Sequence, residues 1–404
     1  MAQGPKILIL THNFPRFRGD FSGVFVELLA RRLVQHGMAP VVLAPHDAGA
    51  ARREESEGVL VRRFPYAPNE GRETLAYRGN MHDQVWGSVL GPLRFLRFLR
   101  AFRKAATETV REEQVELLAG HWLVPAGIVM SQMRPQLNLP MVLSSHGTDI
   151  RMLSRYRRLA YPYFRNLLYS LDRWTVVSSF LKDAVLEIDP NLADRIDLLP
   201  LPHDEKLFYR DEGIEREKGL VVSVTRFTEQ KRVGHLLRAF ATVREKTPSA
   251  RLELYGSGPL QTDLESLIRN LHLDDCTKIM PPVPQEKLRE VYNRAAIVVL
   301  NSFREGFGLT LSEAMLCGAP VIGTRSGGIV DIISHEQTGL LVQPDDVQEL
   351  SRTIERLLSD DGLRHRLARA GQGYAGNTYA SGPLAARYAG ILQDALRRRP
   401  DRSG

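Results

Sequence analysis

Short apolar runs alternate with longer amphipathic stretches along most of this chain, and that alternation limits the folds it can adopt. Lys6–Leu10 reads KILIL, an apolar run of strand length. Ser22–His36 then carries apolar residues at helical spacing, with Ser22 as the predicted N-cap and Gly37 as the stop. Val41–Ala44 is the next predicted strand. A strand, a helix and a strand in this order form a βαβ unit, which predicts a parallel sheet.

The alternation continues in two series. In the first series we expect further strands at Val115–Ala119, Met141–Ser144, Thr175–Val177 and Asp197–Leu199. The second series begins at Leu220 with the strand LVVSVTR. We expect its further strands at Arg251–Tyr255, Thr277–Met280, Ile297–Leu300 and Val321–Gly323. We expect its helices at Arg232–Glu245, after Gly258 and from about Thr310. Two such series predict two doubly wound, Rossmann-like α/β domains, with ligands bound at the carboxyl ends of the strands in a cleft.

The length of 404 residues also favours two domains, because single cores stop growing near ~250–300 residues. The segment Pro200–Gly219 contains prolines and charges with few periodic apolar positions, which is typical of a linker. We therefore predict one domain over residues 1–203, a second over 204–379, and a final amphipathic helix over 380–397.

Composition narrows the function classes. Two cysteines, Cys276 and Cys317, exclude a disulfide framework, and we expect both to be buried. The sequence shows no apolar run of transmembrane length and no secretory architecture at its start, which favours the cytoplasm. The net charge is +7 and the pI about 9.4, which fits an anionic partner. No nucleic-acid-binding motif is found, so we expect no nucleic acid partner.

The strongest motif is the segment REGFGLTLSEAM, in which Glu305 and Glu313 flank a glycine-containing turn. The turn, Gly306-Phe307-Gly308, lies where a predicted strand ends and a predicted helix begins. Unpaired backbone amides at such a helix start suit an anion, above all a diphosphate. One carboxylate would then reach a donor sugar and the other the ribose hydroxyls. The other interpretation is an ordinary turn with two solvated glutamates.

Arg226 and Lys231 form the second motif, on a loop that follows a buried strand. Two cations at a strand's carboxyl end are suited to hold a pyrophosphate and to stabilise charge on the leaving nucleoside diphosphate. Ordinary surface basicity is the competing interpretation. The glycine spacing in the loop Phe14–Gly23 does not match a GxGxxG dinucleotide fingerprint, so no nicotinamide cofactor is expected. The sequence also contains no GxxxxGK[ST] motif, so we do not expect a P-loop enzyme.

Polar residues in the first half of the chain also follow predicted strands. His146 lies in SSHGTDI, and it is a candidate to donate to a sugar hydroxyl or to charge at the reacting centre. His121-Trp122 has the same position after its own strand, with weaker support. The loop Phe14–Gly23 contains Gly23, which permits close backbone approach. For each histidine, a purely structural role is the competing interpretation.

The stretch 91–104, GPLRFLRFLRAFRK, predicts a basic helix with an aromatic face. Phe95, Phe98, Leu99 and Phe102 gather on one side of the helix, and the arginines lie towards the other. This pattern is typical of helices that lie on an anionic membrane surface. The competing interpretation is that the aromatic face packs on its own domain and leaves the arginines in water.

These motifs together resemble one known family: the retaining, nucleotide-sugar-dependent glycosyltransferases called family 4, which have the GT-B fold. The resemblance covers nearly the whole chain. Its most specific element is EGFGLTLSEAMLCGAPVI, and further matches are the Arg226/Lys231 pair, YGSGP, HGTD, HWLVPAG and TGLLVQPDD. The first glycine loop is similar to that of transferases of bacterial polysaccharide assembly.

The resemblance implies roles for individual residues. Arg226 and Lys231 would bind the donor diphosphate, Glu305 would contact the donor sugar near the reacting carbon, and Glu313 would bind the ribose. Further roles in holding or shaping the donor would fall to the following residues: Gly306, Phe307, Gly308, Leu309, His146 and Gly23. The resemblance also implies an acceptor-side first domain, a donor-binding second domain, and a final helix that crosses back to the first domain.

The expected function is therefore transfer of a sugar from a UDP- or GDP-sugar to a saccharide or a lipid-linked acceptor, with no metal and no cofactor. The expected location is the cytoplasm, at the inner face of the plasma membrane through 91–104.

Thr225 and Arg232 depart from the family pattern, because glycines usually stand there, and GDFSG replaces a Gly-Gly pair. A phosphorylase, an epimerase and a catalytically inactive assembly protein remain as alternatives.

Overall fold

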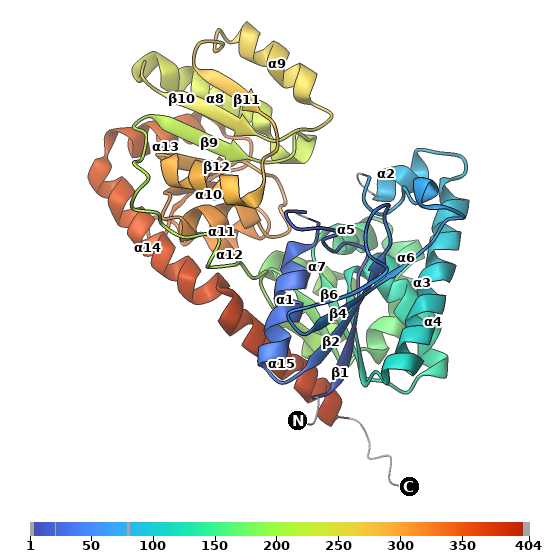
Figure 1. Cartoon of the computed structure of the whole chain (residues 1–404). Helices are drawn as coiled ribbons and strands as arrows, with labels where there is room; N and C mark the ends of the chain where they lie inside the picture. Colours follow the sequence, from blue (N-terminus) through green and yellow to red (C-terminus); the bar gives the residue numbers. More distant parts are fainter. Residues whose placement is uncertain (1–3, 21, 79–80, 399–404) are drawn as a thin grey trace. The chain divides into compact units, whose positions relative to one another are not determined.

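The computed structural model of the chain describes residues 4–20, 22–78 and 81–398. The chain divides into two compact units (Figure 1). The first unit comprises Met1–Val177, Leu181–Pro202 and Ser381–Gly404, and the second comprises Ser178–Phe180 and His203–Ala380. Each unit has its own sheet with helices packed on it. The predicted fold class, two doubly wound α/β domains, is confirmed.

The first unit has an eight-stranded sheet in the order β3-β4-β2-β1-β5-β6-β7-β8. All neighbouring strands are parallel except β3 and β4, which are antiparallel. The strands are β1 (Lys6–Leu10), β2 (Ala39–Pro45), β3 (Arg53–Ser56), β4 (Val59–Phe64), β5 (Leu117–His121), β6 (Met141–Ser145), β7 (Arg173–Val176) and β8 (Ile196–Leu198). The strand order reverses between β1 and β5, so ligands are expected at the carboxyl ends of these two strands.

Helices of the first unit follow these strands along the chain. They are α1 (Val24–Gln35), α2 (Met81–Trp86), α3 (Gly91–Glu113), α4 (Ile128–Met133), α5 (Thr148–Arg155), α6 (Arg157–Ser170), α7 (Ser179–Ile188) and α15 (Ser381–Arg397). The last helix, α15, packs against α1. Tyr388 and Leu392 of α15 belong to the same buried core as Val26 and Leu33 of α1.

The second unit has a six-stranded parallel sheet in the order β11-β10-β9-β12-β13-β14. Its strands are β9 (Leu220–Val224), β10 (Arg251–Tyr255), β11 (Thr277–Met280), β12 (Ile297–Leu300), β13 (Val321–Thr324) and β14 (Leu340–Val342). Its helices are α8 (Val233–Lys246), α9 (Gln261–Asn270), α10 (Gln285–Arg294), α11 (Leu309–Leu316), α12 (Ile329–Ile332), α13 (Val347–Ser359) and α14 (Asp361–Tyr379). The strands β10, β11 and β12 have the predicted bounds.

Two details of the sequence prediction were wrong or incomplete. Ser22 is not the N-cap of α1, because Gly23 holds that position with a φ of 67° and no side-chain cap. In addition, β3, β4 and β14 were not predicted. In β4 the charged pair Arg62 and Arg63 interrupts the apolar pattern, but Arg63 is buried and donates to Glu54 and to the Pro15 carbonyl, each over 2.7 Å.

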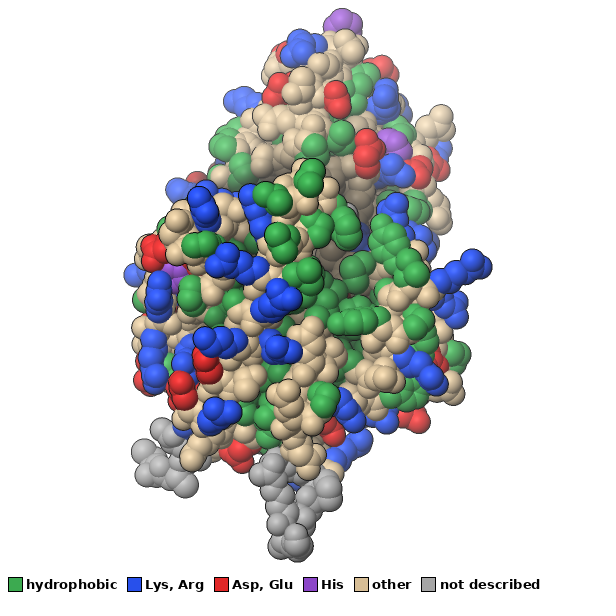
Figure 2. Space-filling model, turned by 90° about the vertical axis from the view of Figure 1, so that its right-hand side faces the viewer, with side chains coloured by type: hydrophobic (Ala, Val, Ile, Leu, Met, Phe, Trp, Pro, Cys, Tyr) green, Lys and Arg blue, Asp and Glu red, His purple; other side chains and the backbone are tan. Residues whose placement is uncertain are grey.

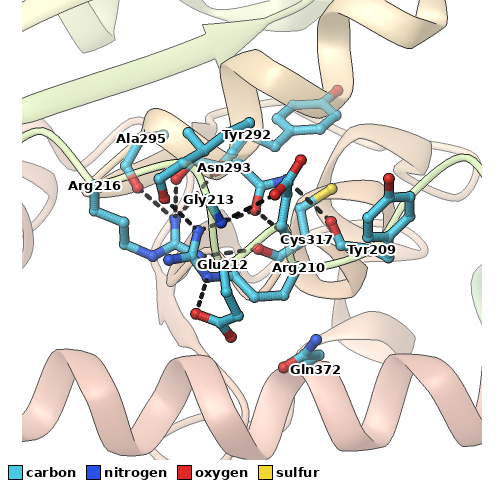
Figure 3. A network of polar contacts seen from close by, with 12 residues as sticks. Tyr209, Arg210, Glu212, Gly213, Arg216, Tyr292, Asn293, Ala295, Cys317 and Gln372 are labelled. Carbon is cyan, nitrogen blue, oxygen red and sulfur yellow. Dashed lines mark hydrogen bonds and ion pairs between the residues drawn. The ribbon is translucent and has the colours of Figure 1, made fainter.

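The predicted linker is packed firmly onto the second unit (Figure 3). The Arg216 guanidinium donates to the backbone carbonyls of Tyr292, Asn293 and Ala295 over 3.1, 3.2 and 2.8 Å, and to that of Cys317 over 2.9 Å. Burial lowers the pKa of Arg216 to about 10. These carbonyls lie at the carboxyl ends of α10 and α11, where backbone oxygens lack partners within the helix. Arg216 therefore fixes the ends of both helices. Both cysteines, including Cys317, are buried and free, as predicted.

Candidate active site

The sheet of the second unit reverses its strand order between β9 and β12, and the loops after these two strands carry Lys231 and Glu305. Open α/β sheets bind ligands outside the strand ends at this kind of switch point. The Lys231 ammonium donates a hydrogen bond to Oε2 of Glu305. Only 19% of the lysine side chain and 16% of the glutamate side chain are exposed. The structure therefore brings together two residues that are 74 positions apart in the sequence.

Backbone contacts hold the loops around this pair. The Phe303 N–H donates to the Gln230 carbonyl over 2.8 Å, which joins the two loops. The loop after β13 approaches Glu305 from the other side, where the Gly328 N–H donates to the Glu305 carbonyl over 2.8 Å. Gly327 has a φ of 63°, and a Cβ there would lie 2.3 Å from the Glu305 carbonyl oxygen. Only glycine permits this approach, so Gly327 helps to place Glu305.

Helix α11 begins directly after the turn Gly306-Phe307-Gly308. Gly308 is its N-cap, with a φ of 117° and no side-chain cap. Phe307 points into the unit, where its ring is buried 5.5 Å from that of Tyr379. Thr310 Oγ1 donates to the Val224 carbonyl over 2.9 Å, which ties the helix start to the end of β9. The Leu311 N–H donates to the Gly308 carbonyl over 2.9 Å, whereas the N–H groups of Leu309 and Thr310 precede the first hydrogen bond of the helix and suit an anion.

Glu313 lies one turn into α11 and is not solvated, since only 7% of it is exposed. The Tyr292 hydroxyl, from α10, donates a 3.0 Å hydrogen bond to its Oε2. Burial raises the pKa of Glu313 from 4.5 to about 7, although the hydrogen bond from Tyr292 acts in the opposite direction. Burial also raises the pKa of Tyr292 well above its ordinary value, so Tyr292 is the donor. The interpretation with two solvated glutamates is therefore wrong.

Arg226 is not a member of the Lys231–Glu305 ion pair. Its side chain is exposed, and within residues 4–20, 22–78 and 81–398 the guanidinium forms no hydrogen bond or ion pair. Its backbone carbonyl accepts a hydrogen bond from the Thr228 N–H over 3.0 Å. Its loop is nevertheless held in place, because the Phe227 N–H donates to the Ser257 carbonyl over 3.0 Å. A Cβ on Gly256 would lie 1.9 Å from the Thr225 carbonyl oxygen, and one on Gly258 would lie 2.4 Å from that of Phe227. The glycines of YGSGP thus support the Arg226 loop.

A cluster of imidazoles lies at the switch point of the first sheet. His12 follows β1, His121 ends β5 and His146 follows β6. His121 Nδ1 lies 3.0 Å from His146 Nε2, and the two rings are stacked with centroids 5.2 Å apart. The ring of Trp122 contacts those of His12 and His146, with centroids 4.6 and 4.5 Å apart, and the ring of Phe25 lies 4.8 Å from that of His146.

All three imidazoles are neutral at pH 7. Burial lowers the pKa of His146 to about 3 and that of His12 to about 4, and it lowers the pKa of His121 well below 6.5. One imidazole of the His121–His146 contact donates and the other accepts. The carboxylate of Asp149 fixes the two loops, because it accepts hydrogen bonds from the backbone N–H groups of Gly147, Ile150 and Leu123 over 3.1, 3.0 and 2.9 Å.

Gly23 begins α1 beside the same sheet edge. A Cβ at this position would lie 2.1 Å from the Asn13 carbonyl oxygen, so the loop after β1 requires glycine here. Arg16 of this loop pairs with Asp20 and with Asp47, each over 2.6 Å. Phe21, in the middle of the predicted glycine loop, lies outside the described residues.

Sequence reasoning missed three neighbours of the predicted residues. Tyr292 is 21 positions from Glu313 on another helix, and no spacing rule relates them. His12 and Asp149 follow β1 and β6, so the rule that polar residues after parallel strands meet at one edge would have identified them.

The described part of the chain has neither a group of metal-ligating side chains nor a helix suited to cross a membrane. No three or more His, Cys, Asp or Glu side chains are grouped there so that they could hold a metal ion. None of its helices combines the length and apolar character that a membrane span requires.

Two parallel-sheet α/β units, with a cation–carboxylate pair and an open helix start at one switch point, define the GT-B class of glycosyltransferases. Residues 22–206 match the description "Glycosyltransferase Family 4", and residues 204–374 match "Glycosyl transferases group 1". The chain belongs to glycosyltransferase family 4, and it is a glycosyltransferase. The resemblance seen in the motifs is therefore confirmed.

Relatives support this assignment over most of the chain. D-inositol 3-phosphate glycosyltransferase from Kribbella flavida is 30% identical over 404 residues, covering 91% of both chains. The putative teichuronic acid biosynthesis glycosyltransferase TuaC of Bacillus subtilis is 23% identical and covers 87% of this chain and 88% of its own.

Solved structures share the fold. Sucrose-phosphate synthase from Thermosynechococcus elongatus superposes with a TM-score of 0.79 at 21% identity, covering 97% of this chain and 99% of that one. Anabaena HepE in complex with UDP-glucose has a TM-score of 0.71 at 18% identity, covering 96% and 99%.

Proposed function

We propose that this protein transfers a hexose from a nucleoside diphosphate sugar to the hydroxyl group of a saccharide or lipid-linked acceptor, with retention of the anomeric configuration. The observation that carries the proposal is the Lys231–Glu305 pair beside the open start of α11 at a switch point. UDP-glucose is the first donor to test, because a structural neighbour, HepE, binds it. A role in polysaccharide biosynthesis fits the relative TuaC.

The donor diphosphate would bind to the second unit. Its charge would be offset by Lys231, by the exposed and unpaired Arg226, and by the amides of Gly308 and Leu309 at the start of α11. Glu305 balances the charge of Lys231 and holds its ammonium group in place. Glu313 would accept hydrogen bonds from the ribose hydroxyls, which its carboxylate form does best.

In the reaction, the bond between the anomeric carbon and the phosphate oxygen breaks as the acceptor oxygen attacks from the same face. The acceptor proton goes to the departing phosphate oxygen, which becomes the diphosphate product. Glu305 would stabilise the positive charge that develops at the anomeric carbon, and Lys231 the negative charge of the leaving group. No protein group has to accept a proton permanently in this scheme.

The first unit would supply the acceptor side. Neutral His146 can donate a hydrogen bond to a sugar hydroxyl, because its pKa of about 3 keeps it uncharged at neutral pH. Its contact with His121 orients the ring. Gly23 would shape the adjoining surface, since any side chain there would clash with the Asn13 carbonyl.

The test has two stages. A thermal-shift and hydrolysis screen with UDP-, GDP- and ADP-sugars identifies the donor, and NMR of the product sugar then gives its anomeric configuration. Lys231→Ala should lower kcat about 100-fold to 1,000-fold, as expected for a preorganised group that stabilises leaving-group charge. Lys246→Ala is the matched control, because Lys246 pairs with Glu355 over 2.9 Å on an exposed surface of the same unit.

Normal turnover by the Lys231 variant would remove the diphosphate assignment. A product of inverted configuration would remove the retaining mechanism while leaving the donor site intact.

A further inference from the structure

Two segments of the first unit concentrate the positive charge of the whole protein. Residues 84–107, which include the first part of α3, contain five Lys and Arg residues and no Asp or Glu. Residues 150–171, which cover most of α5 and all of α6, contain five Arg residues and no Asp or Glu. The two segments therefore carry ten positive charges, whereas the whole chain has a net charge of +7. The remainder of the chain is net negative, so the basic character is local.

The same two segments expose large apolar side chains. Of the thirteen exposed large hydrophobic residues in the described chain, eight lie in them: Trp86, Val89, Leu90, Leu93, Leu96, Tyr156, Leu159 and Tyr163. The exposed fractions reach 61% for Leu93 and 80% for Leu159. A soluble surface rarely gathers such residues without a binding function. Figure 2 shows hydrophobic and basic side chains mixed on the face that carries α3.

Helix α3 has two apolar faces with different uses. Phe98 and Phe102 are fully buried against Phe64 of β4, Phe102 by stacking and Phe98 edge to face, so the aromatic face packs on its own domain. The expectation that this aromatic face meets a membrane is therefore wrong. Leu93 and Leu96 lie on the opposite face, each one turn before an arginine, Arg97 and Arg100. Leucines between arginines, not the phenylalanines, form the exposed surface.

The second segment lies on the same side of the sheet. Both α3 and α6 pack against α4. Tyr156 is the N-cap residue of α6, and together with Leu159 and Tyr163 of that helix it follows helical spacing, so the three form one exposed stripe. We call the exposed side chains of 86–100 and 151–163 the basic apolar face. A hollow of about 340 Å³ opens on it, lined by Leu90, Leu93, Arg94, Arg97 and Arg100.

We propose that the basic apolar face binds the surface of an anionic lipid bilayer. Arginines attract anionic headgroups, while leucine and tyrosine side chains enter the boundary between headgroups and acyl chains. A soluble polyanion such as RNA would engage the arginines but leave the leucines in water. The mixture of exposed arginines with exposed leucines and tyrosines, and the lack of carboxylates in both segments, therefore favour a bilayer over a soluble polyanion.

The experiment uses the full-length protein and vesicles in flotation assays. We expect binding to vesicles with 30% phosphatidylglycerol in about 50 mM salt, little binding to pure phosphatidylcholine, and release as salt rises. Arg94→Gln/Arg97→Gln/Arg100→Gln should weaken binding on the order of 100-fold, at about fivefold per arginine. Leu93→Gln/Leu96→Gln should weaken it at least about tenfold. All five positions are exposed, so thermal stability should not change.

The matched control is Arg238→Gln/Arg269→Gln/Arg369→Gln, which removes the same charge from exposed positions of the second unit. It should bind vesicles like the unmodified protein. Equal binding to neutral vesicles, or no binding to anionic ones at low salt, would overturn the proposal. Unchanged binding by the leucine variant would also overturn it, because the surface would then be a site for soluble polyanions.

Discussion

The hydroxyl of Tyr292 donates a 3.0 Å hydrogen bond to the carboxyl group of Glu313, and both side chains are buried inside the second unit. A buried carboxyl group resists ionisation, and the pKa of Glu313 rises to about 7 as a result. The hydrogen bond from Tyr292 limits that rise, because it stabilises the carboxylate. Glu313 is thus held close to its point of ionisation at neutral pH.

Tyr292→Phe should move the pH profile of the enzyme. Without the hydroxyl, the carboxylate loses a donor, so the pKa of Glu313 rises further and ionisation requires a higher pH. If Glu313 binds ribose as a carboxylate, the acidic limb of kcat/KM should shift upward by about one pH unit, the equivalent of one hydrogen bond to a charged group. The measurement is kcat/KM for the donor between pH 5 and 9.

Tyr169→Phe is the control for this experiment. Tyr169 donates to Asp189 over 2.7 Å in the first unit, so the chemical change is the same but the location is remote from Glu313. A profile that moves equally in both variants, or in neither, would contradict a role for Tyr292 in setting the ionisation of Glu313.

Glu313→Gln should make stability less dependent on pH. The folded pKa, about 7, lies above the ordinary value of 4.5, so the folded state binds this proton more tightly than the unfolded state. The resulting stabilisation is fully present below pH 4.5 and is lost as pH rises through 7. The variant should match the native protein at pH 4 to 5 and exceed it at pH 8 by up to about 3 kcal/mol. Urea unfolding at both pH values measures this, and equal gains at both would be inconsistent with the raised pKa.

Arg216→Met should destabilise the second unit strongly. Four backbone carbonyls would lose their charged donor, and the ends of α10 and α11 would be left without partners. We expect a loss of about 3 kcal/mol or more. Arg251→Met is the control, since Arg251 is half exposed and forms a surface pair with Glu217 over 2.9 Å. That change should cost less than about 1 kcal/mol. Comparable losses in both variants, measured by chemical denaturation, would show that Arg216 is only another surface cation.

Gly327→Ala should impair catalysis through Glu305. The added Cβ would lie 2.3 Å from the Glu305 carbonyl oxygen, and the φ of 63° is unfavourable for alanine. The backbone of Glu305 must then move, and a misplacement of about 1 Å in a reacting group can lower kcat about 100-fold. Gly376→Ala is the control, because a Cβ on that helical glycine meets nothing within 4 Å. Full activity of the Gly327 variant would mean that the loop after β13 does not position Glu305.

Much of the fold could be predicted from the sequence, because buried parallel strands read as short apolar runs between turn residues. Ile7–Leu10 and Ile297–Leu300 are such runs, and β1 and β12 contain them. The switch points follow from the same pattern, and the Lys231–Glu305 segment could be identified because strand ends at a switch point collect ligand-binding residues. Strand β4 was missed because its arginines hide its apolar pattern, although Arg63 is buried through two hydrogen bonds.

The sequence alone determined the two βαβ series, the family and the segments that carry the chemistry, since these depend on residue type and local spacing. Only the tertiary structure decided that Tyr292 reaches Glu313, that His121 stacks on His146, and that α3 buries its phenylalanines and exposes its leucines. Those outcomes depend on contacts between residues far apart in the chain and on the loss of water around them. Neither the long-range contacts nor the desolvation can be predicted from the local spacing of residues. Desolvation in the folded core sets the ionisation of Glu313 and of the histidines.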